Sequence, residues 1–319
     1  MNLAEICNVD MKLLDKSIKE LLDKDKELPY YYKQQLENLI FSSGKRIRPI
    51  FTVLGSYFGM EVDKNSIYNL AAIFEIIHTA SLIHDDMIDK ADIRRGTPTL
   101  HKQFGTFKSL MLGNYLVALC SEQVCNYNYE EHYYKNFKLT ELCDSEINQQ
   151  SLLFNFNITF KEYITKTKNK TALLIAASLI GGAKLAMANN DITKILYNYA
   201  INLGISFQII DDILDFTQNR DHLGKPNGAD LINGNITLPV IFALNNDKIS
   251  KKIRALNKDS ALEDFQECIN FIINSDAIEK SKQVSKKYIN KSKKVISKLH
   301  HPKTTMLYSI LEELEKRTY

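Results

Sequence analysis

The chain has 319 residues, of which 45% are hydrophobic and 25% charged, and its formal net charge is +3. These proportions are ordinary for a globular protein, and so small a net charge does not indicate a nucleic-acid-binding protein. The five cysteines include no Cys-x-x-Cys pair, which favours buried reduced thiols over disulfides or a zinc site.

Glycine and proline are scarce, at 12 and 6 residues, and most prolines stand where a helix would begin or end. The long apolar segments between them have helical spacing, which predicts an all-α fold. The length would allow two domains, but no Ser/Gly-rich or Pro-rich linker divides the sequence. We therefore expect one domain over 1–319.

The predicted elements follow one another with short connections. In chain order, helices are expected at 1–27, 30–43, 49–60, 67–93, 106–123, 139–155, 160–168, 169–188, 191–217 and 235–246, with a Tyr- and Asn-rich helix or loop at 124–138 and lysine-rich amphipathic segments over 249–319. The lysines of the last third lack interleaved aromatic residues at stacking spacing. They therefore indicate a solvated helix face and no nucleic-acid partner.

Two features of the sequence bear on localisation. The N-terminus lacks the basic and apolar regions of a signal peptide. The longest uncharged run, 195–210, contains Asn and Gln and falls short of the roughly 18 apolar residues that a membrane span needs. We therefore expect a cytoplasmic protein.

Two aspartate clusters share one spacing and one setting. They are Asp85-Asp86-x-x-Asp89 and Asp211-Asp212-x-x-Asp215. Each ends an almost uncharged stretch, since 68–84 carry a single charge, at Glu75, and 195–210 carry none. Carboxylates at i and i+4 lie on one face of a helix, one turn apart. Both clusters stand near a C-terminal helix end, where the helix dipole disfavours negative charge.

Acidic residues in so unfavourable a place are typical of functional sites. For either cluster alone, a solvated acidic helix end is the alternative. Two such faces pointed at each other would form an oxygen-only pocket that hard divalent cations could fill, and the cations would hold a diphosphate. We therefore expect the two acid-bearing helices to face one cavity.

Basic residues near the clusters supply partners for such an anion. The candidates are Lys45 and Arg48 in Gly44-Lys45-Arg46-Ile47-Arg48-Pro49, Arg94 and Arg95 after the first cluster, Lys170 at the start of an apolar helix, and Lys225 in Gly224-Lys225-Pro226. Arginine side chains and helix N-termini both suit phosphate oxygens. Each alone would more often be a surface charge, but four groups beside a glycine, a proline or a helix start favour phosphate binding.

Two histidines flank the apolar stretch before the first cluster. His78 lies two helical turns before Asp85 on the same face, so we expect it to contact the ligand. For His84 we expect a structural role.

Seven segments carry a resemblance to a known family, and their order and spacing match it. They are GKRIRP (44–49), IIHTASLIHDDMID (76–89), RRGTPT (94–99), KTALL (170–174), FQIIDDILD (207–215), GKPNGADL (224–231) and TLP (237–239). On these segments the chain resembles the trans-type polyprenyl diphosphate synthases. Among them it looks most like the catalytic subunit of bacterial two-component heptaprenyl or hexaprenyl diphosphate synthases. The resemblance implies an all-α, isoprenoid-synthase-type helical bundle around a deep central cavity, usually dimeric.

The resemblance also implies a role for each candidate residue. Asp85, Asp86, Asp89, Asp211, Asp212 and, less directly, Asp215 would hold about three Mg²⁺ ions on an allylic diphosphate. Arg94, Lys170 and Lys225 would contact that same diphosphate. Lys45, Arg48, His78 and Arg95 would hold isopentenyl diphosphate. Thr171 and Gln208 would line the reacting centre.

Two positions depart from the family pattern. Asn235 follows Gly234 where the family often has lysine, which removes a cation from the allylic side of the site. The heptaprenyl-type catalytic subunits look similar here, so we interpret this as a subfamily trait. Asn114 follows Gly113 where many members have aspartate, and we assign it no role.

Product length should depend on the wall below the metal site. The wall candidates on the first acid-bearing helix are Phe74, Ile77, Ala80 and Ser81. Short-chain members tend to fill the first turn with an aromatic residue, and a turn spans about 5.4 Å. Ala80 and Ser81 leave that turn open. We therefore expect the product to grow past the C20 class. Taken with the resemblance, this implies that isopentenyl diphosphate is added to farnesyl or geranylgeranyl diphosphate, giving a hexaprenyl to octaprenyl product.

Three alternatives remain open: a geranylgeranyl-type short-chain synthase, a class I terpene cyclase, and a non-catalytic subunit of a heteromeric synthase. A cyclase usually carries an Asn/Ser/Glu second metal motif and lacks the GKRIRP segment. A non-catalytic subunit would not need both aspartate clusters intact. Besides the two substrates, the expected partner is a second copy of the chain or a small regulatory subunit, with peripheral membrane contact for product release.

Overall fold

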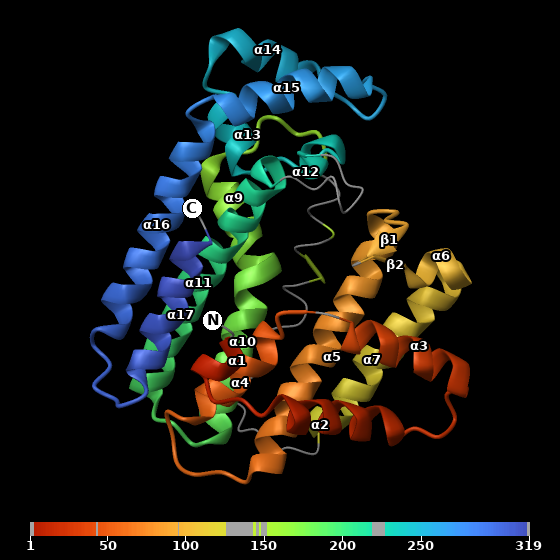
Figure 1. Ribbon diagram of the computed structural model, residues 1–319, viewed down its shortest axis with the longest axis vertical. Helices are drawn as coiled ribbons and strands as arrows, with labels where there is room; N and C mark the ends of the chain where they lie inside the picture. The colour runs from red at the N-terminus through yellow and green to blue at the C-terminus, as the bar shows by residue number, and fades with distance from the viewer. Residues whose placement is uncertain are drawn as a thin grey trace. The chain divides into compact units, whose positions relative to one another are not determined.

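The computed structural model describes residues 3–42, 44–94, 96–125, 143–144, 147, 152–218 and 227–317 (Figure 1). Within these ranges the regular structure is helical except for one two-stranded ribbon, so the predicted all-α fold is confirmed. The chain forms two compact units, Met1–Lys135 with Ala177–Leu196 and Asn136–Ala176 with Tyr197–Tyr319. The expectation that residues 1–319 form a single domain stays a prediction.

The first unit is built around one long helix. Its elements are α1 (Leu3–Ile6), α2 (Met11–Asp23), α3 (Tyr30–Phe41), α4 (Ile47–Ser56), α5 (Lys64–Ile88), β1 (Ile93–Arg94), β2 (Thr97–Pro98), α6 (Leu100–Phe104) and α7 (Thr106–Cys125). α5 packs against α2, α4 and α7, and Figure 1 shows α5 in orange beside α7 in yellow. Its buried face includes Ile73, Ile76 and Ile83. The unit's core therefore fixes the helix that carries the first acid cluster.

The N-terminal region folds as two helices, so the single helix expected at 1–27 is wrong. Asn8, after α1, has a φ of 51° in the left-handed region, which breaks the helix. The Asp10 carboxylate accepts hydrogen bonds from the backbone N–H groups of Lys12 and Leu13 and so caps α2.

Among the residues that the structure describes, α5 is the one helix long and apolar enough to cross a membrane by length and composition. Of its most apolar window, 67% is buried inside the protein, as in the core helix of a soluble protein. α5 is thus weak evidence for a membrane span, because the unit's own core already covers most of its apolar face.

The second unit carries the other acid cluster on α11. Its elements include α9 (Phe160–Thr167), the π-helical turn η2 (Lys168–Ala172), α12 (Ala229–Ile232), α13 (Leu238–Ala243), α14 (Asp247–Ala255), α15 (Leu262–Asn274), α16 (Ala277–Ile296) and α17 (Thr304–Lys316). The unit boundaries fall within α10 (Leu173–Leu185) and α11 (Asn190–Thr217). Ile209 and Phe216 of α11 are buried in one core cluster with Val240 of α13 and Ile272 of α15.

Most other predicted helices are confirmed with shifted ends. The segments 30–43, 49–60, 106–123, 160–168 and 191–217 correspond to α3, α4, α7, α9 and α11. The helix expected at 67–93 ends at Ile88, because Lys90 has a φ of 49° and the chain turns into the ribbon. The helix expected at 169–188 begins as a π-helical turn. Most of 124–138 and 139–155 lies outside the described residues.

Candidate active site

The first acid cluster stands at the C-terminal end of α5. Asp86 is buried, Asp85 is half-buried and Asp89 is exposed. Asp89 is the C-cap residue, and its backbone N–H donates to the Asp85 carbonyl at 2.8 Å. The cluster therefore occupies the last turn of the helix, as the spacing predicts.

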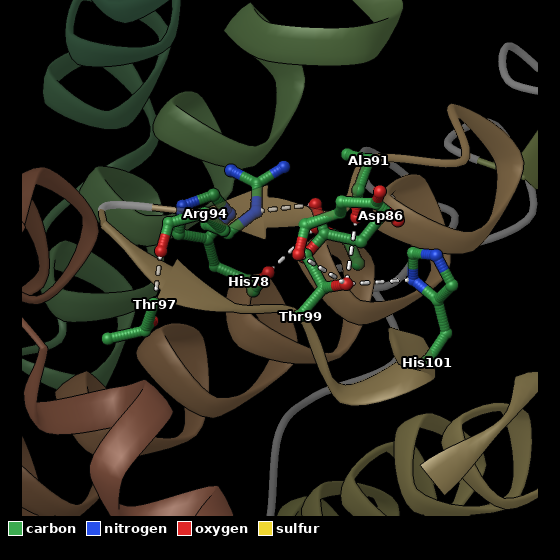
Figure 2. Close-up of polar contacts among 9 residues, drawn as sticks. His78, Asp86, Ala91, Arg94, Thr97, Thr99 and His101 are labelled. Atoms are coloured by element: carbon green, nitrogen blue, oxygen red, sulfur yellow. Dashed lines mark hydrogen bonds and ion pairs between the residues drawn. The ribbon is translucent and has the colours of Figure 1, made fainter. Parts of the chain in front are cut away.

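Arg94 reaches back to this cluster from the ribbon. Its Nε donates to the Asp86 carboxylate at 2.7 Å, as Figure 2 shows. The ribbon pairs Arg94 with Thr97, and the Thr97 hydroxyl donates to the Arg94 carbonyl. The Thr99 hydroxyl donates to the Ala91 carbonyl at 2.8 Å and ties the ribbon to the end of α5. These contacts hold the Arg94 guanidinium on a buried carboxylate.

The two arginines of the GKRIRP segment have different surroundings. Arg46 is buried, with Nη1 3.4 Å from Glu75 Oε1 and Nη2 3.7 Å from Asp15 Oδ1. Arg48 is half-buried. Burial lowers the Arg48 pKa to about 10, although the negative charges of Glu75 and Asp85 act in the opposite direction. Arg46 thus pairs with acidic residues of the first unit. Arg48, in contrast, stays charged at neutral pH and is close enough to Asp85 to interact with its charge.

The other first-unit candidates are placed as follows. Lys45 is exposed and His78 is half-buried, seven residues before Asp85 on α5. Arg95 lies outside the described residues. His84 packs against α7, where a Cβ at Gly113 would meet its Nε2 at 2.3 Å, and burial lowers the His84 pKa. This contact gives His84 the packing role that was expected for it.

Of the four wall candidates, Ala80 faces a different direction from the others. At about 100° per residue, Ser81, Ile77 and Phe74 lie within about 80° of Asp85 around the helix, whereas Ala80 lies about 140° away. Ala80 is completely buried and belongs to the unit's core cluster. Ser81 and Ile77 are half-buried, and Phe74 is buried outside that cluster. The Asp85 face therefore carries Ser81 and not Ala80 in the first turn.

The second acid cluster lies near the C-terminal end of α11. The Asp211 carboxylate accepts a hydrogen bond from Arg317 Nη2 at 3.2 Å. The Arg317 guanidinium also lies over the Phe207 ring, 4.9 Å from its centre. No sequence motif marks Arg317, which stands at the end of a lysine-rich segment.

Asp212 is the buried member of this cluster. Its carboxylate accepts hydrogen bonds from the Tyr163 hydroxyl at 2.6 Å and from Gln208 Nε2 at 2.8 Å. Burial and the nearby Asp230 raise the Asp212 pKa to about 7, whereas Tyr163, Gln208 and Lys166 lower it. The Tyr163 pKa is raised well above its usual value by burial, so its hydroxyl stays a donor.

Asp215 has a positioning role at the start of α12. Its side chain is buried and accepts a hydrogen bond from the Asp230 backbone N–H at 3.1 Å, while its carbonyl accepts from the Gly228 N–H at 2.9 Å. Free N–H groups at a helix start are commonly satisfied in this way. That Asp215 also supports a metal less directly stays a prediction.

Thr171 and Gln208 lie together, whereas their place at the reacting centre stays a prediction. The Thr171 hydroxyl donates to Gln208 Oε1 at 2.7 Å, and Gln208 in turn donates to Asp212. The close approach depends on Gly204, where a Cβ would lie 2.5 Å from Ala172 Cα. Lys170 is half-buried within η2, a type of turn that often marks functional sites. Lys225 lies outside the described residues.

The donor chemistry of both clusters fits hard divalent cations, because all the candidate ligands are carboxylate oxygens. Within the described ranges no group of three or more Asp, Glu, His or Cys side chains gathers closely enough to hold a metal ion. Asp86 and Asp211 each hold an arginine instead, and Asp212 holds a tyrosine and an amide. A metal ion would have to compete with these partners.

Comparisons with known proteins identify the family of the chain. The model of the family described as "Polyprenyl synthetase" matches residues 29–272. Heptaprenyl diphosphate synthase component 2 of Bacillus subtilis is 36% identical over 314 residues, covering 98% of this chain and 89% of that protein. The protein of the same name from Geobacillus stearothermophilus is 40% identical over 256 residues, covering 80% of each.

Solved structures give the same result. The crystal structure of heptaprenyl diphosphate synthase from Staphylococcus aureus superimposes with a TM-score of 0.90 at 35% identity, covering 97% of this chain and 98% of that one. A decaprenyl diphosphate synthase from Rhodobacter capsulatus gives 0.88 at 26% identity, covering 99% and 98%. With its all-α fold and its match over most of its length, the chain belongs to the polyprenyl synthetase family and is a prenyltransferase.

Proposed function

We propose that the chain condenses isopentenyl diphosphate with farnesyl or geranylgeranyl diphosphate to make an all-trans polyprenyl diphosphate of hexaprenyl to octaprenyl length. The observation that carries this function is the pair of aspartate clusters, each at the end of a long helix and each with an arginine on one carboxylate. The relatives named heptaprenyl diphosphate synthase support the medium to long product.

The family generally uses Mg²⁺. About three ions would be held by the carboxylates of both clusters, and bound Mg²⁺ supplies charge stabilisation to the leaving diphosphate. Arg94, Lys170 and Lys225 would contact the diphosphate of the allylic substrate. Arg48, with Lys45, His78 and Arg95, would bind that of isopentenyl diphosphate. Arg48 suits this role because it stays charged near Asp85.

The reaction needs charge stabilisation more than a nucleophile. The allylic C–O bond breaks, its electron pair leaves with the diphosphate, and an allylic cation remains. The double bond of isopentenyl diphosphate attacks the cation, and loss of a proton restores a double bond. Preorganised cations near the leaving group favour the first step. Gln208 and Thr171, linked to Asp212, would line the space where the new bond forms.

Two relatives are named component 2 of their synthase, which supports a heteromeric enzyme for this chain as well. We propose that the chain is the catalytic subunit, because both aspartate clusters are present. Its partner would be a small regulatory subunit, with a homodimer as the alternative. We also propose that the enzyme is cytoplasmic and that it contacts a membrane surface when it releases its product.

Product analysis tests the function. The purified chain is incubated with Mg²⁺, farnesyl diphosphate and labelled isopentenyl diphosphate, with and without candidate small subunits. The products are dephosphorylated and analysed by mass spectrometry. Hexaprenyl to octaprenyl alcohols are expected. Geranylgeraniol alone would indicate a short-chain synthase, and cyclic hydrocarbons a terpene cyclase. Absence of any product in every combination would contradict catalysis by this chain.

A further inference from the structure

Lys166 stands in the last turn of α9 and is held by a residue far away in sequence. Its Nζ donates a hydrogen bond to Asn235 Oδ1 at 2.6 Å, and the Lys166 side chain is half-buried. Asn235 is itself fixed, because its backbone N–H donates to the Asp230 carbonyl at 2.8 Å after the left-handed Gly234. The ammonium group is therefore positioned by the fold and is not a loose surface charge.

The surroundings of Lys166 belong to the second acid cluster. Tyr163 is three residues earlier on α9, so the two side chains share a helix face, and Tyr163 donates to the Asp212 carboxylate. Lys166 itself lies close enough to Asp212 for its positive charge to lower the pKa of that carboxyl. One face of α9 thus presents a cation beside a carboxylate that we expect to hold Mg²⁺ on the allylic diphosphate.

Asn235 lies in the loop between α12 and α13, where its side chain contacts Lys166. The Asn235 amide itself carries no charge. Asn235 instead offers an oxygen that orients a lysine from another helix. An ammonium group has three N–H donors, so it can hold the Asn235 amide and a phosphate oxygen at the same time.

We propose that Lys166 is a further substrate-binding residue, which Asn235 orients to contact the diphosphate of the allylic substrate. It would supply from α9 the cation that the Gly234-Asn235 sequence lacks. The role rests on the proposed function, and it makes Asn235 a positioning residue.

Calorimetry separates this role from a structural one. The probe is farnesyl S-thiolodiphosphate, an allylic analogue whose C–S bond resists ionisation, titrated into the chain with saturating Mg²⁺. We expect Lys166→Ala and Lys166→Gln to weaken its binding by about tenfold, the effect of losing one charge-assisted contact. Lys166→Gln retains an amide donor for Asn235, so a merely structural role would spare it. Binding of isopentenyl diphosphate should change less than about twofold, because that substrate uses other cations.

Two further variants complete the experiment. Lys161→Ala removes an exposed lysine from the first turn of the same helix and should leave binding of the analogue unchanged. Lys166→Ala with Asn235→Lys returns a cation from the opposite side and should recover most of the lost affinity. Unchanged affinity in both single Lys166 variants would overturn the assignment, as would equal losses in Lys166→Gln and Lys161→Ala. Absence of binding by the wild-type chain would instead overturn the proposed function.

Discussion

Arg317, directly after the last helix, donates a hydrogen bond to Asp211 at 3.2 Å and lies over Phe207 one turn earlier on α11. Arg94 makes the corresponding contact with Asp86 in the first acid cluster at 2.7 Å. Each cluster thus contains one carboxylate whose charge an arginine already offsets. This reduces the repulsion within each acid cluster when no metal is bound.

The first prediction concerns Arg317. Both side chains of its ion pair are partly exposed, so Arg317→Ala should lower the free energy of unfolding by no more than about 1 kcal/mol. Because this variant removes an arginine that competes for Asp211, added Mg²⁺ should raise the melting temperature more in it than in the wild type. Thermal denaturation with Mg²⁺ and with a chelator measures the difference. An equal Mg²⁺ effect in both proteins would show that Arg317 does not compete with the metal.

The second prediction concerns a proposed metal ligand. Asp85→Ala should lower turnover by about a thousandfold or more, because it removes a carboxylate that we expect to bind Mg²⁺. The melting temperature of the metal-free protein should stay unchanged or rise, since Asp85 is only half-buried and stands beside Asp86 at the negative end of the helix dipole. Asp92→Ala is the matched control, since it removes an exposed acid just beyond the same helix. Near-normal turnover of Asp85→Ala with Mg²⁺ would contradict the site.

The third prediction uses the two neighbouring wall positions. Ser81→Phe should shorten the product, because Ser81 lies on the Asp85 face of α5 and is half-buried. Ala80→Tyr should instead lower the free energy of unfolding by about 1–3 kcal/mol, since Ala80 is completely buried in the core cluster. Reversed-phase analysis of dephosphorylated products measures the product length, and thermal denaturation measures the change in stability. Unchanged product length in Ser81→Phe would show that the Asp85 face of α5 does not limit the length of the product.

The fourth prediction follows from the pKa of Asp212. A carboxyl group whose pKa is raised from 3.8 to about 7 on folding binds its proton more tightly in the folded chain than in the unfolded one. Between these two values its contribution to stability therefore falls as the pH rises, and the penalty is complete above about pH 7. In the metal-free protein, Asp212→Asn should reduce the loss of stability between pH 5 and pH 8, as measured by chemical denaturation. The same loss in both proteins would show that Asp212 does not titrate in this range.

The sequence predicts the helices and both acid clusters because these depend on local spacing. Apolar periodicity gives α5 and α11, and i, i+4 spacing gives the shared face of each cluster. The break at Asn8 and the π-helical turn at Lys168–Ala172 depend on backbone conformations that no residue pattern marked. That Ala80 belongs to the chain-length wall stays a prediction, because counting positions along a helix does not give the direction of a side chain around it.

Contacts between distant segments were the hardest to predict. Lys166 and Asn235 are separated by 69 positions, and Arg317 and Asp211 by 106. Neither pair has a sequence signature, because a lysine or arginine has the same sequence pattern whether it is solvated or bonded to a distant amide or carboxylate. The contacts of Arg46 with Glu75 and Asp15 likewise have no sequence signature.

The central claim is that the aspartates of this chain hold Mg²⁺, and that the metal in turn holds a diphosphate. Titration of a bisphosphonate into the wild-type chain, with Mg²⁺ and then with a chelator, tests it most directly. We expect saturable binding that requires Mg²⁺ and is lost in Asp85→Ala and in Asp212→Asn. Equal binding without the metal, or none when it is supplied, would contradict the claim.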